Sequence, residues 1–84
     1  MLQSRLCKLW DMDKSKLKHS IGLRIRELRR ADRLSQERLA LMADTNRSYL
    51  ASVERGERNV GITTLGKIVS ALGMTFEEFF QGIQ

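Results

Sequence analysis

The segment TNRSYLASVERGERN, residues 45–59, carries the side chains with the most specific chemistry in the chain. The guanidinium of Arg47 is a planar fork of N–H donors that can bond guanine O6 and N7 together. Leu50 and Val53 have the spacing of a helix with one apolar side. A helix fits a DNA major groove about 12 Å wide, so this pattern favours the reading of double-stranded DNA. We expect the polar side of the helix to face outward, with Arg47, Ser48, Ala51, Ser52 and Arg55.

Positive charge is concentrated in the first third of the chain. The 84 residues include 15 Lys and Arg and 10 Asp and Glu, for a formal net charge of +5 and a pI near 10.0. Residues 1–34 hold ten basic and four acidic residues, whereas residues 35–59 hold four of each. Long-range attraction to a polyanion would therefore come from the first third, and the neutral middle would act through particular side chains.

Several classes of function find no support in the sequence. Cys7 is the single cysteine, so neither an intramolecular disulfide nor a cysteine-based zinc site can form. His19 has no second ligand or acidic partner near it in sequence, and we expect a surface position rather than a metal site. No nucleophile–base set or glycine-rich phosphate loop is present, so we expect neither enzyme activity nor a cofactor. Without a secretory signal or an apolar run near the ~20 residues of a membrane span, we expect a soluble, cytoplasmic protein.

Apolar spacing predicts five helices, and no segment alternates as a strand does, so the predicted class is all-α. The helices are expected at residues 17–31, 36–43, 47–55 and 62–72, with a short fifth helix after residue 75. The second and third helices are expected to bury Leu39, Met42, Ala43, Leu50 and Val53. The fourth helix is expected to bury a stripe made of Ile62, Leu65, Ile68, Val69 and Leu72.

The helix boundaries carry capping residues. Ser35 and Asn46 can accept hydrogen bonds from free backbone N–H groups at the start of the second and third helices. Thr75 and Glu78 have the spacing of a capping box. Gly56 follows the third helix and can adopt the left-handed conformation that often ends a helix. These signals predict separate short helices rather than one long one.

The chain is predicted to consist of one compact domain at residues 17–84 and an N-terminal extension at residues 1–16. The extension has Leu2, Leu6, Leu9 and Trp10 at near-helical spacing but no clear stop signal. It could be a frayed helix, a segment that packs only in a dimer, or a leader that precedes a later start at Met12. We favour weak order for this extension.

The run from SQERLALMA through TNRSYLASVERGERN to TLGKIVSALGMTFEEFF resembles the lambda-repressor-like helix-turn-helix domains of the Xre and Cro type. The resemblance covers about residues 17–82 and implies a five-helix domain that binds operator DNA as a two-fold dimer. Its second and third helices would form the helix-turn-helix. Within the family, the sequence is most similar to small stand-alone regulators such as restriction-modification controller proteins. This implies a transcriptional regulator, a repressor by default, without an attached sensory or catalytic domain.

The resemblance also implies roles for individual residues. Gln36 matches a family residue that holds a backbone phosphate, and Arg29 and Glu54 match a partly buried ion pair. Asp44 stands where the family usually has glycine in the turn, and aspartate tolerates a left-handed conformation better than most residues. We expect DNA contacts from nine residues: Gln36, Asn46, Arg47, Ser48, Tyr49, Ser52, Arg55, Arg58 and Asn59.

For some of these residues a second role stays open. Arg47 could contact a phosphate in place of a base, or it could be a solvated charge. Tyr49 could pack on a sugar or a thymine methyl group, or it could cover the edge of the core. Asn59 could equally belong to a plain polar loop, whereas Arg55 and Arg58 are expected near phosphates.

Partner surfaces are expected at the C-terminal end of the domain. Adjacent helical positions point about 100° apart, so Phe76, Phe79 and Phe80 cannot all face one small core. We expect Phe80 and Ile83, with parts of the fourth helix, to form a homodimer interface; in the alternative, all three rings pack within one subunit. RNA polymerase would be a further partner of a regulator. An antitoxin that binds a toxin, or a helical protein-interaction module without DNA binding, are the other interpretations.

Overall fold

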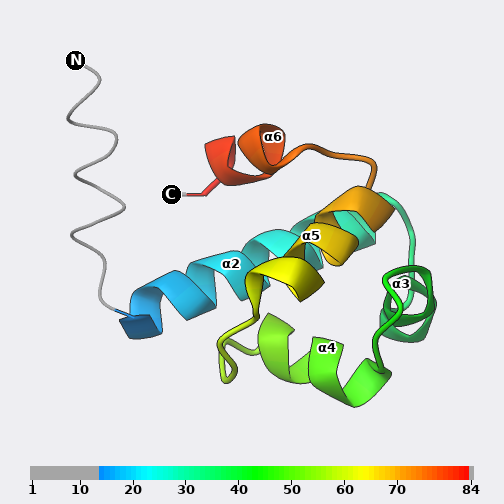
Figure 1. Cartoon of the computed structure of the whole chain (residues 1–84), viewed down its shortest axis with the longest axis horizontal. Helices are drawn as coiled ribbons and strands as arrows, with labels where there is room; N and C mark the ends of the chain where they lie inside the picture. The colour runs from blue at the N-terminus through cyan, green and yellow to red at the C-terminus, as the bar shows by residue number, and fades with distance from the viewer. Residues whose placement is uncertain (1–13, 84) are drawn as a thin grey trace.

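The computed structural model describes residues 14–83, which form five α-helices and no strand (Figure 1). The helices are α2 (Lys14–Ala31), α3 (Gln36–Met42), α4 (Arg47–Glu54), α5 (Ile62–Ala71) and α6 (Phe76–Gln81). The all-α prediction is thereby confirmed for this part of the chain. The first helix begins at Lys14, three residues before its predicted start. The expectation of weak order falls mainly on residues 1–13, which lie outside the described residues.

Side-chain caps separate the short helices at the predicted places. Ser35 Oγ accepts a hydrogen bond from the Arg38 backbone N–H at 3.0 Å, and Asn46 Oδ1 accepts one from Tyr49 at 2.7 Å. At α6 the capping box is complete, because Thr75 Oγ1 accepts from the Glu78 N–H while Glu78 Oε1 accepts from the Thr75 N–H. Caps of this kind typically contribute about 1 kcal/mol each, which matters for helices of six to eight residues.

Two non-glycine residues in the left-handed region end α2 and α3. Arg33 has φ 58° and Asp44 has φ 55°. The Asp44 conformation agrees with the turn position where the resembled family usually has glycine, whereas the left-handed Arg33 was not predicted. Left-handed conformations at non-glycine residues cost on the order of 1–3 kcal/mol, and surrounding packing must hold them in place. Gly56, with φ 76°, adopts the same conformation after α4 as predicted.

The core lies where α2, α3, α4 and α5 meet, and α6 closes one end of it. Leu39, Leu50, Val53 and Ile68 are among its buried residues, together with Ile25, Ala40, Ala43, Leu65, Val69, Leu72 and Phe79. This burial confirms that Leu39, Ala43, Leu50 and Val53 dock the two central helices onto the others.

Two residues that were expected in the core are exposed. Met42 is 45% exposed, because the buried arc of α3 runs through Leu39, Ala40 and Ala43 and Met42 lies about 100° from its centre. Ile62 is 69% exposed, because it is the first residue of α5, where no preceding helical turn covers its side chain. The predicted core was therefore wrong at these two helix ends.

Helix α2 is the central element: in Figure 1, α4 lies on one side of it and α6 on the other. Gly22 makes the α2–α4 contact possible, because a Cβ atom there would lie 2.1 Å from the carbonyl oxygen of Val53. On the α6 side, Arg24 Nε donates to the Phe79 carbonyl at 2.9 Å and Arg24 Nη2 donates to the Glu78 carbonyl at 3.1 Å. Helix α4 thus meets α2 near its C-terminal end, and α6 is held to α2 through the carbonyls of Glu78 and Phe79.

We predict that Gly22→Ala destabilises the fold by about 3 kcal/mol or more, because the added methyl group meets a backbone oxygen that cannot rotate away. Gly61→Ala is the matched control: no atom lies within 4 Å of its Cβ position, and we expect a change below about 1 kcal/mol. Urea unfolding monitored by circular dichroism measures both. Equal stabilities for the two variants would contradict the close α2–α4 contact.

Candidate nucleic-acid interface

Helix α4 presents a polar face to the outside and an apolar face to the core. Leu50 and Val53 are 0% and 1% exposed, whereas Arg47 and Ser48 are exposed and Ser52 is half-buried. The orientation predicted for this helix is confirmed. Helices α3 and α4 are joined by the short turn at residues 43–46, in which Thr45 N donates to the Ala40 carbonyl at 2.9 Å. These two helices and their turn have the form of a helix-turn-helix.

An open groove of about 810 Å³ runs between α2, the start of α3 and α4. We call it the arginine groove. Its lining residues are Arg26, Arg29, Arg30, Ser35, Gln36, Glu37, Arg47, Glu54 and Arg55. Residues from three helices that are far apart in sequence therefore meet at one polar concave surface.

A buried ion pair forms the floor of the arginine groove. Arg29 Nε donates to Glu54 Oε2 at 2.7 Å and Arg29 Nη2 donates to Glu54 Oε1 at 3.0 Å, and the two side chains are 10% and 3% exposed. Arg29 Nη1 also donates to the Leu34 carbonyl at 2.8 Å. Gln36 Nε2 donates to Glu54 Oε1 at 3.1 Å, so the network joins α2, α4 and the start of α3. The predicted Arg29–Glu54 pair is present and bidentate.

The walls of the groove carry exposed positive charge. Arg26, Arg30 and Arg47 are exposed, and none of their three side chains forms a hydrogen bond or ion pair with another residue in the range 14–83. Arg55 Nε donates to Glu57 Oε2 at 3.0 Å, and this contact raises the pKa of Arg55 and lowers that of Glu57. The groove therefore combines a neutralised floor with uncompensated guanidinium groups on two sides, which favours an anionic ligand.

Three predicted residues form a cluster on the flank of α4. Arg58 Nε donates to Ser52 Oγ at 3.1 Å, and the Arg58 guanidinium lies 5.0 Å from the centre of the Tyr49 ring. Ser52 Oγ in turn donates to the Tyr49 carbonyl at 2.7 Å. Tyr49 also packs against the core, so it covers the core edge, one of the two roles left open for it. The cluster holds an exposed arginine beside the outward face of α4.

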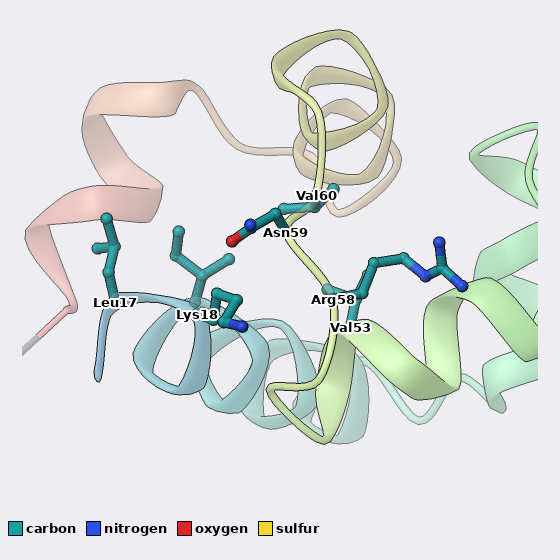
Figure 2. Close-up of a pocket in the computed structure, with 7 residues that line it drawn as sticks. Leu17, Lys18, Val53, Arg58, Asn59 and Val60 are labelled. Atoms are coloured by element: carbon teal, nitrogen blue, oxygen red, sulfur yellow. The ribbon is translucent and has the colours of Figure 1, made fainter. Parts of the chain in front are cut away.

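Asn59 lies apart from these residues. Figure 2 shows Arg58 extending along α4 while Asn59 points the other way, toward α2. There, Asn59 and Arg58 help to line a small cavity of about 150 Å³ together with Leu17, Lys18, Ile21, Val53 and Val60. Asn46 has a local structural role, because its side-chain oxygen caps the start of α4. The structure therefore brings Gln36, Arg47 and Arg55 together in the arginine groove and separates Asn59 from them.

Arg26 and Arg30 were not among the predicted contact residues. Each directly follows a residue that α2 turns inward, Ile25 and Arg29, and this register places both on the side of α2 that borders the groove. The register of α2 could have distinguished Arg26 and Arg30 from the other basic residues in the first third of the chain. In the sequence they appeared only as part of a general positive charge.

Other kinds of site are not found in the described part of the chain. Among residues 14–83, no group of three or more His, Cys, Asp or Glu side chains is placed to hold a metal ion. None of the described helices combines the length and the apolar character needed to cross a membrane.

The fold and the site define a helix-turn-helix protein. The chain belongs to the helix-turn-helix family HTH_3, which matches residues 25–79. Control protein C.MunI of Mycoplasma sp is 39% identical over 69 residues, which are 81% of this chain and 93% of that protein. Putative antitoxin HigA2 of Mycobacterium tuberculosis is 37% identical over 65 residues, 75% of this chain and 64% of its own length.

Solved structures of similar proteins agree with this assignment to the family. The restriction-modification controller protein C.AhdI from Aeromonas hydrophila matches with a TM-score of 0.72 and 44% identity, covering 75% of this chain and 96% of C.AhdI. Controller protein C.Esp1396I, solved as a tetramer in complex with its natural 35 base-pair operator, matches with a TM-score of 0.73 and 29% identity. That match covers 77% of this chain and 86% of C.Esp1396I. The predicted resemblance to lambda-repressor-like controllers is confirmed.

We predict that Glu54→Leu lowers the free energy of unfolding by about 3 kcal/mol or more, because it leaves the Arg29 guanidinium buried without its counter-charge. The double variant Arg29→Met/Glu54→Leu should lose less than Glu54→Leu alone, because no unpaired charge remains. Chemical denaturation of the two variants and the wild type measures this coupling. A double variant less stable than the single one would show that Arg29 contributes mainly through other contacts.

Proposed function

We propose that this chain is a sequence-specific regulator of transcription that binds double-stranded DNA in the cytoplasm and represses by occupying an operator. The observation that carries the proposal is the outward face of α4, with exposed Arg47 and Ser48 bordering the arginine groove. A helix with small exposed side chains can approach base edges in the major groove, and an arginine at its start can select guanine. The similarity to control proteins favours a restriction-modification controller as the particular role.

The contacts divide into base reading and phosphate binding. We assign Arg47 to the bases, because it begins α4, is exposed and has no partner among residues 14–83 that would hold it back. Gln36 donates one amide N–H to Glu54, and its second N–H is free to donate to a phosphate. Arg55, at the other end of α4, is assigned to a phosphate as well. This contact would replace its exposed ion pair with Glu57.

The cluster on the flank of α4 supports this division. Arg58 is held beside α4 by Ser52 and by the Tyr49 ring, so less rotamer freedom is lost when it meets a phosphate. Asn46 and Ser48 lie at the first turn of α4 and are assigned to contacts near Arg47. Asn59 points away from this face, so we assign it to the α4–α5 loop and not to the DNA (Figure 2).

A homodimer would place two copies of α4 about 34 Å apart on a palindromic site. The structure suggests where its interface would lie. Phe80 and Ile83 are half-buried and pack against the core, whereas Phe76 is 39% exposed and Ile62 is 69% exposed. The Phe76 ring lies over Gly66, one turn from Ile62 on α5, so an apolar strip runs across the two helices. We propose that Ile62 and Phe76 are central to the interface and that Phe80 lies at its edge.

The other interpretations are weaker. The residues of the arginine groove argue against a protein-interaction module without DNA binding, because such a module would not need three unpaired arginines on one surface. An antitoxin role would add a toxin as partner, and no surface of residues 14–83 favours it over the controller role. We propose that the chain has no enzyme activity, as expected for a regulator of this family.

We predict that Arg47→Ala reduces discrimination between a selected duplex and a random-sequence duplex by about 1–3 kcal/mol, because one bidentate base contact is lost. Gln36→Ala should weaken both duplexes equally, because a phosphate contact carries no sequence information. Fluorescence anisotropy with a duplex that the wild-type protein selects from a random pool measures both. Equal losses on both duplexes for Arg47→Ala would refute the base-reading assignment.

We predict that Ile62→Asp weakens self-association at least tenfold, because it places a charge in the centre of the proposed apolar interface. An aspartate in the first turn of α5 is compatible with the helix, so folding should be retained. Leu41→Asp is the matched control, since Leu41 is also 69% exposed but lies on α3. Sedimentation equilibrium measures the association constants. A wild-type monomer at micromolar concentration, or equal effects of both variants, would contradict this interface.

A further inference from the structure

Arg26 and Arg30 are the unpaired arginines of the arginine groove that the proposed contacts of α3 and α4 leave unused. They stand one turn apart on α2, the helix opposite α4 across the groove. Neither side chain forms a hydrogen bond or an ion pair with any other residue between 14 and 83. The neighbouring Arg29 differs, because Glu54 neutralises it. The wall made by α2 therefore presents two exposed guanidinium groups.

This arrangement costs stability in the free protein. Like charges at positions i and i+4 of a helix destabilise it by roughly 0.2–0.5 kcal/mol. Arg47 and Arg55 add positive charge from the other side of the groove, and among the lining residues only Glu37 and the paired Glu54 oppose it. An anion placed in the groove would remove this repulsion. A surface that binds a polyanion is expected to show such a destabilising concentration of positive charge in the free protein.

We infer that Arg26 and Arg30 form a second phosphate-binding wall on α2, which holds the DNA backbone beside the stretch that α4 reads. The inference rests on the proposed DNA binding and adds α2 to the interface. The rise along α2 between the two residues is about 6 Å, and each DNA strand carries a phosphate for about every 3.4 Å of its axis. The two guanidinium groups can therefore engage different phosphates of one strand.

The position of this wall on α2 also indicates what its phosphate contacts would contribute to binding. The groove begins at Gln36, which is held by the ion pair that Arg29 makes with Glu54. Because Arg26 and Arg30 flank Arg29 on α2, their phosphates would be fixed relative to Gln36 through one rigid network. Contacts of this kind set the register of α4 on the duplex without reading a base. They concern affinity and orientation rather than sequence preference.

The test is the salt dependence of binding to a random-sequence duplex, compared for the wild type and Arg26→Gln/Arg30→Gln. Each phosphate contact adds about 0.9 to the slope of log affinity against log salt concentration. We expect the double variant to reduce the slope by about 1.8 per bound protomer, with the same fold-loss of affinity on a selected and on a random duplex. Arg26→Lys/Arg30→Lys should restore the slope, because lysine binds phosphate as a point charge.

The control variant distinguishes a direct phosphate contact from a general effect of the protein's net charge. Lys67→Gln removes a charge from α5, outside the arginine groove, and should leave the slope unchanged. An unchanged slope for Arg26→Gln/Arg30→Gln, or an equal fall per charge for Lys67→Gln, would overturn the inference while leaving the proposed function intact. If the wild-type protein bound no duplex even in dilute buffer, the proposed function itself would fail. Thermal unfolding of each variant verifies that the exposed substitutions leave the fold in place.

Discussion

The bidentate pair between Arg29 and Glu54 is the interaction on which the geometry of the interface depends. It joins α2 to the last residue of α4, and Gln36 adds the start of α3 to the same carboxylate. A buried charge pair tolerates little displacement, because either partner left alone would be strongly destabilising. The pair therefore fixes the angle between the helices as well as their distance. Gly22 permits it, since only a residue without a Cβ lets α2 approach the end of α4 this closely.

The polar groove follows from this constraint. Once Glu54 is turned inward, Arg47, two turns before it on α4, borders the same groove, and the exposed arginines of α2 and α4 line one space. One charge pair thus supports the fold, while the neighbouring side chains of Arg26, Arg30 and Arg47 stay unpaired within the described part of the chain. Two left-handed residues, Arg33 and Asp44, keep the connections around α3 short enough to hold this arrangement.

The core of the domain is small, so its short helices depend on caps and on packing against their neighbours. The caps at Ser35, Asn46 and Thr75 define short helices that could not persist alone, and packing against α2 and α5 stabilises them. Apolar side chains at the helix ends are left over by this packing, as the exposure of Ile62 and Phe76 shows. In a protein of this size, a second subunit is a natural way to cover them.

The sequence by itself determined the five helices, their caps and the inward side of α4, because local spacing and capping chemistry act within a few residues. It also indicated the family, and with it the pairing of Arg29 with Glu54. It could not place Met42 or Ile62 correctly, since the burial of a residue at a helix end depends on what the neighbouring elements cover. Nor could it distinguish Arg26 and Arg30 from other basic residues, or separate Asn59 from Arg58. Only the tertiary structure decided these points, because they depend on how helices distant in sequence meet, as α2 and α4 do at Gly22.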